Sequence, residues 1–418
     1  MREDYALSLS KGWKVVKLKD ITKVITKGTT PSTYGYDFLE NGEVNYIRAE
    51  GISKSGYVDQ KTFLKINTEC HDRLKRSKLE ENDVLFSIAG MALGKSGIVK
   101  KEYLPANTNQ AVAIVRPNNL VFPKFLLYYI ANPSFYQLVN SVSGQAAQPN
   151  INLNQVGSLP INLPPLETQR KIASILSGYD DLIENNLKRI KILEEMAQQT
   201  YEEWFVRMRF PGYETAVLNE EMGLPEGWEN GTIETVTKYL SGFAFKSAQF
   251  KENGNGVIRI KNIGNNTINL SDVAYVDNEY ASKQKRYLLK SGDLLIAMTG
   301  ATIGKVGIMP HSNERFYLNQ RVGKFVTENT AFINCFFNST YGINQVINIA
   351  GGAAQPNISA QQILDIELVV PSKQILNQFS DTFNKGISMI INLQSQNQRL
   401  REARDLLLPR LMMGILEV

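Results

Sequence analysis

The segment SIAGMALGKSGIVK (87–100) contains residue types that bind nucleotide phosphates in other proteins. Its Ala89, Gly94, Lys95 and Ser96 are spaced as in a P-loop, with Ala in place of the first Gly. In a P-loop, backbone N–H groups surround the phosphates, the Lys contacts their oxygens, and Ser or Thr binds Mg²⁺. A helix follows the motif in such proteins, but no helical pattern follows this Lys. A nucleotide site therefore needs support from elsewhere in the chain.

An internal repeat argues against that site. Residues 79–99 (LEENDVLFSIAGMALGKSGIV) return as 289–309 (LKSGDLLIAMTGATIGKVGIM). In the second copy, Thr299 replaces the first small residue and Val306 replaces the Mg²⁺-binding hydroxyl. Both copies keep an apolar run, a Gly, a Gly-Lys pair and a second apolar run. This pattern predicts two strands joined by a glycine turn, whose lysine is either solvated or in contact with a phosphate.

The repeat extends over most of the chain. Residues 143–165 (SGQAAQPNINLNQVGSLPINLPP) are echoed by 350–371 (AGGAAQPNISAQQILDIELVVP), and residues 12–28 are echoed by 227–242. Short apolar runs such as DVLFSIAG predict strands, and residues such as 123–142 predict short helices between them. The expected fold class is α+β, with two duplicated domains.

A long amphipathic helix is predicted after each copy. In the first helix, apolar or small residues recur in steps of four and three from Ile172 to Trp204. The second helix repeats this pattern from Phe379 to Leu411. Such spacing is the heptad pattern of helices that pair along one apolar seam.

Neither helix can bury such a stripe alone. We therefore expect an antiparallel coiled coil with an approximate internal two-fold, which places Asn186 and Asn397 at one level of the seam. A separate core helix in each domain is the alternative. The expected order is a first domain, a central spacer helix, a second domain and a C-terminal spacer helix, over residues 1–165, 166–212, 213–370 and 371–418.

Composition restricts the class of protein. The net charge is +5, but Lys and Arg clearly exceed Asp and Glu only in residues 1–165, by 20 to 14. DNA binding would therefore depend on local patches. Two Cys and two His without a Cys-x-x-Cys pair argue against a zinc site. No apolar run of membrane-spanning length and no signal peptide is found, which predicts a cytoplasmic protein.

The order of these motifs resembles that of specificity subunits of type I restriction–modification systems, over nearly the whole chain. The resemblance rests on the Gly-Trp that opens each copy, on the two glycine turns, on AAQPNI in both copies, and on EEWFV (202–206) and LLPRLMMG (407–414) at the helix ends. It implies two target-recognition domains that each read half of a split double-stranded DNA site. It also implies that the helices set the gap between the halves and dock two methyltransferase subunits, through Trp204, Phe205, Leu407 and Leu411.

The resemblance further implies a subunit without catalytic activity in an adenine-N6 methylating complex. The sequence contains no Asn/Asp-Pro-Pro-Tyr/Phe motif and no glycine fingerprint for S-adenosylmethionine. S-adenosylmethionine, ATP and Mg²⁺ are therefore expected in the partners, which are the methyltransferase subunits and the restriction/translocase subunits, and no cofactor is expected in this chain.

Candidate DNA contacts lie in polar loops of both copies, because Lys, Arg, Tyr, Thr, Asn and Gln contact phosphates and base edges. Residues identical in both copies cannot distinguish different bases, so we expect backbone contacts or loop-shaping roles for Lys95, Lys305, Gln148 and Gln355. Arg48 and Arg259 follow matching strands. The residues that differ are candidates for base reading: Lys27, Thr30, Tyr34, Lys54, Lys246, Lys261 and Asn265.

Two other classes of protein stay open at this stage. The repeats could form a scaffold that binds proteins, and salt-dependent retention on duplex DNA with a methyltransferase partner would distinguish the two classes. A nucleotide-dependent enzyme is the other class, against which Val306 argues.

Overall fold

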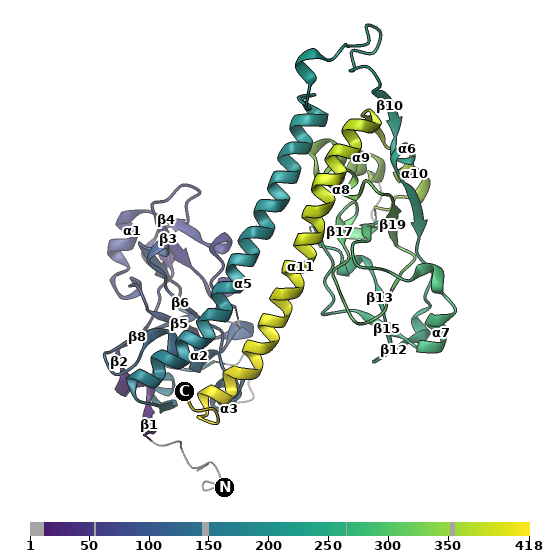
Figure 1. The fold of residues 1–418 in the computed structure, drawn as a ribbon. Coiled ribbons are helices and arrows are strands. Elements are labelled where there is room, and N and C mark those ends of the chain that lie inside the picture. Colours follow the sequence, from purple (N-terminus) through teal and green to yellow (C-terminus); the bar gives the residue numbers. More distant parts are fainter. Residues whose placement is uncertain (1–11, 54–55, 144–149, 265, 352–355) are drawn as a thin grey trace. The chain divides into compact units, whose positions relative to one another are not determined.

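The computed structural model describes residues 12–418 except 54–55, 144–149, 265 and 352–355 (Figure 1). Its contacts divide the chain into two compact units. Unit 1 comprises Met1–Leu182 and Leu400–Val418, and unit 2 comprises Ile183–Arg399. Each unit therefore includes part of both long helices. Within the described residues, no helix is long and apolar enough to span a membrane.

Unit 1 contains a sheet of order β2-β8-β5-β6, a sheet of order β4-β3-β7 and the pair β1-β9. Its strands are β1 (Lys14–Lys17), β2 (Thr22–Lys27), β3 (Val44–Ile47), β4 (Leu64–Ile66), β5 (Val84–Ser87), β6 (Ser96–Ile98), β7 (Ala106–Thr108), β8 (Val112–Pro117) and β9 (Pro160–Leu163). Its short helices are α1 (Thr68–Arg73), α2 (Pro123–Ala131), α3 (Pro133–Ser143) and α4 (Leu153–Ser158). The helical segment predicted over 123–142 is interrupted at Asn132, which is extended before Pro133.

Unit 2 contains a sheet of order β11-β19-β16-β17-β14, a sheet of order β12-β15-β13-β18 and the pair β10-β20. Its strands are β10 (Glu229–Thr232), β11 (Lys238–Ser241), β12 (Phe250–Lys251), β13 (Asn255–Ile258), β14 (Asn266–Thr267), β15 (Ala274–Val276), β16 (Leu294–Ala297), β17 (Val306–Ile308), β18 (Phe316–Leu318), β19 (Val322–Val326) and β20 (Glu367–Val370). Its short helices are α6 (Ile233–Val236), α7 (Asn278–Ser282), α8 (Thr330–Asn338), α9 (Thr340–Ala350) and α10 (Ala360–Leu364).

The same hairpin recurs in each unit. β5 pairs antiparallel with β6 and β8, and β16 pairs antiparallel with β17 and β19. All four residues of β5 and of β16 are buried, which explains why seven of these eight residues are apolar and only Ser87 is polar. β6 begins directly after Lys95, so a strand stands where a P-loop would require a helix. The prediction of two strands joined by a glycine turn is confirmed in both copies.

The two long helices are α5 (Leu166–Tyr201) and α11 (Lys373–Met412). α5 ends earlier than the predicted spacer, because Glu202–Val206 forms a turn of π-helix. Both helices contribute to the core of each unit. In unit 1, Ile172 and Leu176 of α5 pack in one cluster with Leu411 of α11. The helices therefore bury their stripes in the unit cores as well as against each other.

Within unit 2, α5 and α11 pair antiparallel along the predicted seam. Ile190 packs against Ile390 and Leu393. One turn earlier in α5, the Asn186 side chain donates a hydrogen bond from Nδ2 to Oδ1 of Asn397, with the two atoms 2.9 Å apart. Asn186 and Asn397 are only 6% and 1% exposed. The prediction that they lie at one level of the seam is confirmed.

Within unit 1, a charged cluster links the same two helices. Arg404 Nη1 of α11 lies 2.6 Å from Asp180 Oδ1 of α5. The other carboxylate oxygen of Asp180 accepts a hydrogen bond from the Tyr128 hydroxyl of α2 at 2.6 Å. Burial, together with the neighbouring Asp180 carboxylate, raises the pKa of Tyr128, so this phenol stays protonated and donates. Arg404 therefore fills a seam position at which the heptad pattern has no apolar residue.

We expect Asn186→Leu to lower the free energy of unfolding by about 1–3 kcal/mol, because it leaves the buried amide of Asn397 without its partner. The double variant Asn186→Leu/Asn397→Leu should regain most of that loss, since two apolar side chains then face each other across the seam. Denaturation of the four proteins in a double-mutant cycle measures the coupling. Additive losses would contradict a direct interaction between the two amides.

Candidate nucleic-acid interface

The glycine turn of unit 1 lies beside Asn150, shortly before α4. Gly90 and Gly94 have φ of 66° and 81°, a conformation that glycine adopts without steric cost. Ala89, at the start of the turn, forms a bridge with Asn150, and the half-buried Lys95 ends the turn. Two motifs that both copies share, the glycine turn and the end of the AAQPN segment, therefore meet in one place.

Unit 2 repeats this arrangement. Gly300 and Gly304 both have φ of 76°. Thr299 forms a bridge with Asn357, and the Gly300 N–H donates to the Pro356 carbonyl oxygen at 3.1 Å. Lys305 is exposed at the end of the turn. The repeated sequence therefore encodes a repeated surface feature rather than a nucleotide site.

Arg48 and Arg259 occupy equivalent positions, each directly after a strand that pairs in parallel with its neighbour. Their backbone φ values are −108° and −114°. In each residue the Nε atom is buried and lacks a hydrogen-bond partner. The Arg48 Nε lies 4.0 Å from Glu50, which is too far for a hydrogen bond, and the Arg259 guanidinium stacks over the Phe250 ring at 5.6 Å. Both guanidinium groups therefore keep unused donor capacity.

In unit 1, the predicted base-reading residues Lys27, Thr30 and Tyr34 lie at the end of β2 and in the turn after it. The buried Tyr46 holds this turn, because its hydroxyl donates to the Thr29 carbonyl oxygen at 3.0 Å. Burial raises the pKa of Tyr46, so the donor proton stays in place. Thr30 donates to the side chain of Gln110.

The end of α1 and the 3-10 helix after it border this turn, although neither was among the predicted contacts. The Arg73 guanidinium lies over the Tyr34 ring at 5.2 Å, and Arg76 Nη2 donates to Thr29 Oγ1 at 3.2 Å. A signal for this segment is present in the sequence, because the Lys-Arg pair at 75–76 recurs at 285–286, the same offset as the glycine turns.

In unit 2, Lys246 is exposed in the loop after β11, and Lys261 is exposed in the turn after β13. The Lys261 Nζ atom lies 2.6 Å from Asp272 Oδ2. The pKa of Asp272 is lowered because its carboxylate accepts this hydrogen bond. The turn that carries Lys261 contacts the glycine turn, since Thr302 Oγ1 donates to the Ile260 carbonyl oxygen at 3.3 Å. Lys261 thus lies near the shared motif and Lys246 lies on a separate loop.

Four predicted DNA contacts fall outside the described residues: Lys54, Gln148, Asn265 and Gln355.

The four predicted docking residues are largely occupied within their own units. Phe205 is 6% exposed and packs edge-on against Phe332 and Phe379, with ring centroids 4.9 and 5.0 Å away. Leu411 is 2% exposed in the core of unit 1. Trp204 and Leu407 are partly buried against the same two cores. Phe205 and Leu411 therefore offer almost no surface to a partner, because the aromatic and leucine positions at the helix ends complete the cores.

The repeated acidic residue before each central strand has a structural role. The Asp83 side chain is completely buried and accepts hydrogen bonds from Arg116 Nε and Nη2 at 2.8 and 2.9 Å. In unit 2, Lys324 Nζ lies 2.7 Å from Asp293 Oδ2. Burial raises the pKa of Cys335 to about 12, so its thiol stays protonated. Among the described residues, no three His, Cys, Asp or Glu side chains are grouped as a metal site would require.

The fold defines a protein with two α+β domains of one design. Comparison with known proteins identifies the family: the chain belongs to the type I restriction modification DNA specificity domain family, whose model matches residues 10–195 and 225–400. The chain is 26% identical over 425 residues to the MjaVIII specificity subunit of Methanocaldococcus jannaschii, covering 100% of this chain and 96% of that one. It is 22% identical to the HindI specificity subunit of Haemophilus influenzae, covering 96% and 99%.

A solved structure has the same fold. It is the S subunit of a type I restriction-modification system from M. genitalium, which aligns with a TM-score of 0.60 at 14% identity and covers 97% of each chain. The predicted α+β class with duplicated domains and the predicted membership of the specificity-subunit family are confirmed by these matches together.

The glycine turn offers a direct test of its geometry. In Gly94→Ala the new Cβ would lie 2.5 Å from the Tyr136 ring, whereas in Gly90→Ala it would meet no atom within 4 Å. We expect Gly90→Ala to cost about 1–2 kcal/mol for its left-handed backbone. Gly94→Ala should cost about 1–2 kcal/mol more, because the ring must move. Denaturant unfolding of the full chain measures both, and equal losses would contradict the packing of the turn against α3.

Proposed function

We propose that each unit of this specificity subunit reads one half of a split double-stranded DNA site. The observation that carries the proposal is the combination of a repeated framework with different loops. The glycine turn and the strand-end arginine have matching backbones in both units. The polar loops differ, with Lys27, Thr30 and Tyr34 in unit 1 against Lys246 and Lys261 in unit 2. Two units with the same backbone framework but different loop residues are suited to reading two different half-sites.

The two kinds of residue take different roles in this proposal. The residues that differ contact base edges, and Lys54 and Asn265 belong to this group. The residues that both copies share contact the sugar-phosphate backbone or shape the loops: Arg48, Arg259, Lys95, Lys305, Gln148 and Gln355. The equivalent strand-end positions of the two arginines support a backbone contact, because a guanidinium binds phosphate oxygens through several N–H groups.

The chemistry of the complex is assigned to partner subunits. Methyltransferase subunits supply S-adenosylmethionine chemistry at adenine N6, and restriction/translocase subunits supply ATP and Mg²⁺ chemistry. The relatives support this assignment, since they are named specificity subunits of type I restriction enzymes. The chain itself acts as the non-catalytic DNA reader. A protein-binding scaffold is less favoured, because it gives no reason for an arginine at the same strand end in both units.

Two copies of one methyltransferase subunit need equivalent docking surfaces. α5, α11 and the turns that directly follow them offer such surfaces at positions 207 residues apart, which are exposed and apolar in both copies. Leu182 is 53% exposed and its equivalent Met389 is 45% exposed. Val206 and its equivalent Met413 are 57% and 39% exposed. These four residues replace Phe205 and Leu411 as the proposed contacts, beside the partly buried Trp204 and Leu407.

The long helices are also the proposed ruler between the half-sites. α5 has 36 residues, which corresponds to about 54 Å of continuous helix. A continuous helix changes length little, so the gap between the half-sites should follow helix length and not loop sequence.

Exchange of residues 12–160 for those of a relative with another specificity tests both ideas. We expect one half-site to change completely, while the other half-site and the gap stay the same, because unit 2 and both helices are retained. Mapping of methylated adenines in the genome of an expressing cell reads the whole site. A change in both half-sites, or in the gap alone, would contradict the proposal.

The docking proposal predicts a stepwise loss of partner subunits. Leu182→Glu should remove one methyltransferase subunit from the complex and Leu182→Glu/Met389→Glu should remove both, since a carboxylate replaces an apolar contact. Leu120→Glu is the matched control, because Leu120 is 58% exposed but lies outside the long helices. Mass photometry of purified complexes counts the subunits. Two subunits retained by the double variant would contradict docking at these positions.

A further inference from the structure

A Lys-Arg pair recurs on a short 3-10 helix in each unit. Lys75 and Arg76 lie in Lys75–Ser77, and Lys285 and Arg286 lie in Lys285–Tyr287. All four side chains are exposed. They are the only identical residues between positions 70–78 and the matching 280–288. The identity of this pair in both units therefore does not follow from a general similarity of the two segments.

The backbone around the pair is the same in both units. After the first pair, the Leu79 N–H donates to the Ala106 carbonyl oxygen at 3.0 Å, and after the second, the Leu289 N–H donates to the Phe316 carbonyl oxygen at 2.8 Å. Both pairs therefore lie at the same place relative to the parallel strand that follows the hairpin, β7 in unit 1 and β18 in unit 2.

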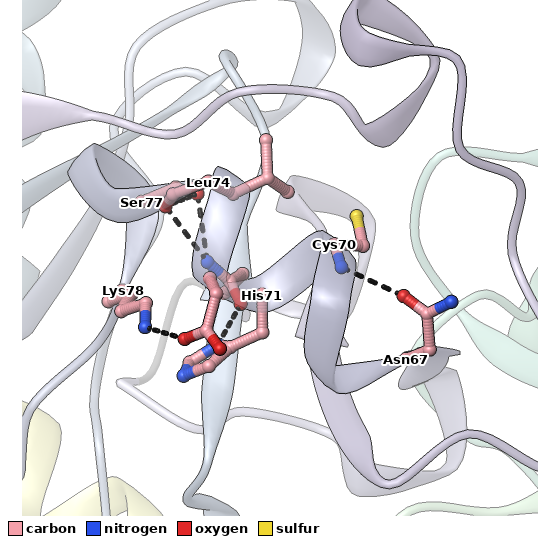
Figure 2. Close-up of polar contacts among 8 residues, drawn as sticks. Asn67, Cys70, His71, Leu74, Ser77 and Lys78 are labelled. Atoms are coloured by element: carbon pink, nitrogen blue, oxygen red, sulfur yellow. Dashed lines mark hydrogen bonds and ion pairs between the residues drawn. The ribbon is translucent and has the colours of Figure 1, made fainter.

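Different side chains hold this backbone in the two units. In unit 1, Asn107 of β7 donates from Nδ2 to the Leu74 carbonyl oxygen at 3.2 Å and to Ser77 Oγ at 3.0 Å. Figure 2 labels Leu74 and Ser77, and dashed lines mark the two bonds. His71 Nδ1 contacts the other amide atom of Asn107. In unit 2 the Tyr287 ring packs against Phe243 with centroids 5.4 Å apart. The side chains that hold the 3-10 helix differ between the two units, so they do not explain why both units have the Lys-Arg pair.

The four side chains of the Lys-Arg pairs make few contacts within the fold. Neighbouring lysines are paired with acids: Lys78 Nζ lies 2.6 Å from Asp72, and Lys283 Nζ lies 2.9 Å from Glu279. Within the part of the chain that the structure describes, none of the four repeated cations forms an ion pair within 4 Å. Arg76 makes one hydrogen bond, to Thr29 Oγ1. The charges thus remain available to a ligand.

The pair also borders a proposed base-reading loop in both units. Arg76 contacts Thr29, next to Thr30 in the turn after β2. In unit 2, the ring contact between Tyr287 and Phe243 joins the same 3-10 helix to the loop that carries Lys246. A ligand that reaches these loops would therefore pass close to the pair.

We propose that Lys75 with Arg76, and Lys285 with Arg286, bind the phosphodiester backbone of DNA, one pair at each half-site. The inference rests on the proposed function and assigns phosphate contacts that fix register without reading sequence. Identical side chains in two units that read different half-sites cannot discriminate between bases, whereas every half-site presents the same phosphates. The planar Arg fork and the compact Lys charge both suit phosphate oxygens.

The test uses the full chain assembled with its methyltransferase subunits. The probes are a duplex that carries the mapped site and a duplex of equal length with both half-sites scrambled, each titrated at several KCl concentrations. Lys75→Gln/Arg76→Gln should weaken binding to both duplexes by a similar factor, on the order of tenfold at about 0.1 M salt. The slope of log K against log salt should become less steep by about 2, since about 0.9 is expected for each phosphate contact. Lys285→Gln/Arg286→Gln should do the same.

Two control variants separate this effect from loss of net charge. Lys14→Gln/Lys19→Gln removes two exposed lysines near β1, at the end of unit 1 away from α1, and should leave the slope unchanged (Figure 1). Lys75→Arg/Arg76→Lys keeps both charges and should keep the slope. Melting temperatures of all variants should match that of the parent chain, because the pairs are exposed.

The outcomes distinguish this inference from the function on which it rests. A parent complex that binds both duplexes equally would contradict the proposed function. A parent complex that prefers the mapped site, with both Lys-Arg variants retaining its slope, would overturn the phosphate assignment alone. Loss of preference for the mapped site at an unchanged slope would also overturn it, since the pairs would then read bases.

Discussion

The structure depends on the burial of two long apolar stripes whose residues lie far apart in the sequence. The last turns of α11 complete the core of unit 1, where Leu408, Leu411 and Met412 pack with Ile172 and Leu176. Unit 1 is therefore made of the beginning and the end of the chain. Its core is not complete until the final residues have joined it. The contacts that enclose this core join distant parts of the sequence, which makes closure costly in chain entropy.

The features that the sequence predicts are those with a local signal. The seam follows from heptad spacing, so the pairing of Asn186 with Asn397 follows from the spacing of apolar residues along each helix. The glycine turn follows from its repetition, because only a backbone requirement is common to a copy with Ser96 and a copy with Val306. Base-reading residues on loops have no such periodicity, and their roles remain predictions.

The features that the sequence did not predict depend on contacts between distant segments. Arg76 could not be recognised as a neighbour of the proposed base-reading loop from the sequence, because it contacts Thr29, 47 residues earlier, only in the folded chain. Phe205 resembles an exposed docking residue in the sequence, yet four aromatic rings of unit 2 lie at 4.9 to 6.0 Å from its ring. The stripe of α5 has two neighbours, α11 and the unit core, and heptad spacing alone does not say which residue faces which.

The two units keep one backbone while their side chains diverge. The cluster of Tyr128, Asp180 and Arg404 in unit 1 corresponds to Cys335, Ile387 and Ala197 in unit 2, so a charged network in one unit is apolar in the other. Such replacement is tolerated because each core packs separately, and a change in one does not strain the other. The same independence lets the loops of one unit change without effect on the other. The two copies nevertheless keep the same residues at the glycines and lysine of the turn, at the strand-end arginine and at the Lys-Arg pair, as two modules that bind the same kind of ligand in the proposed function would require.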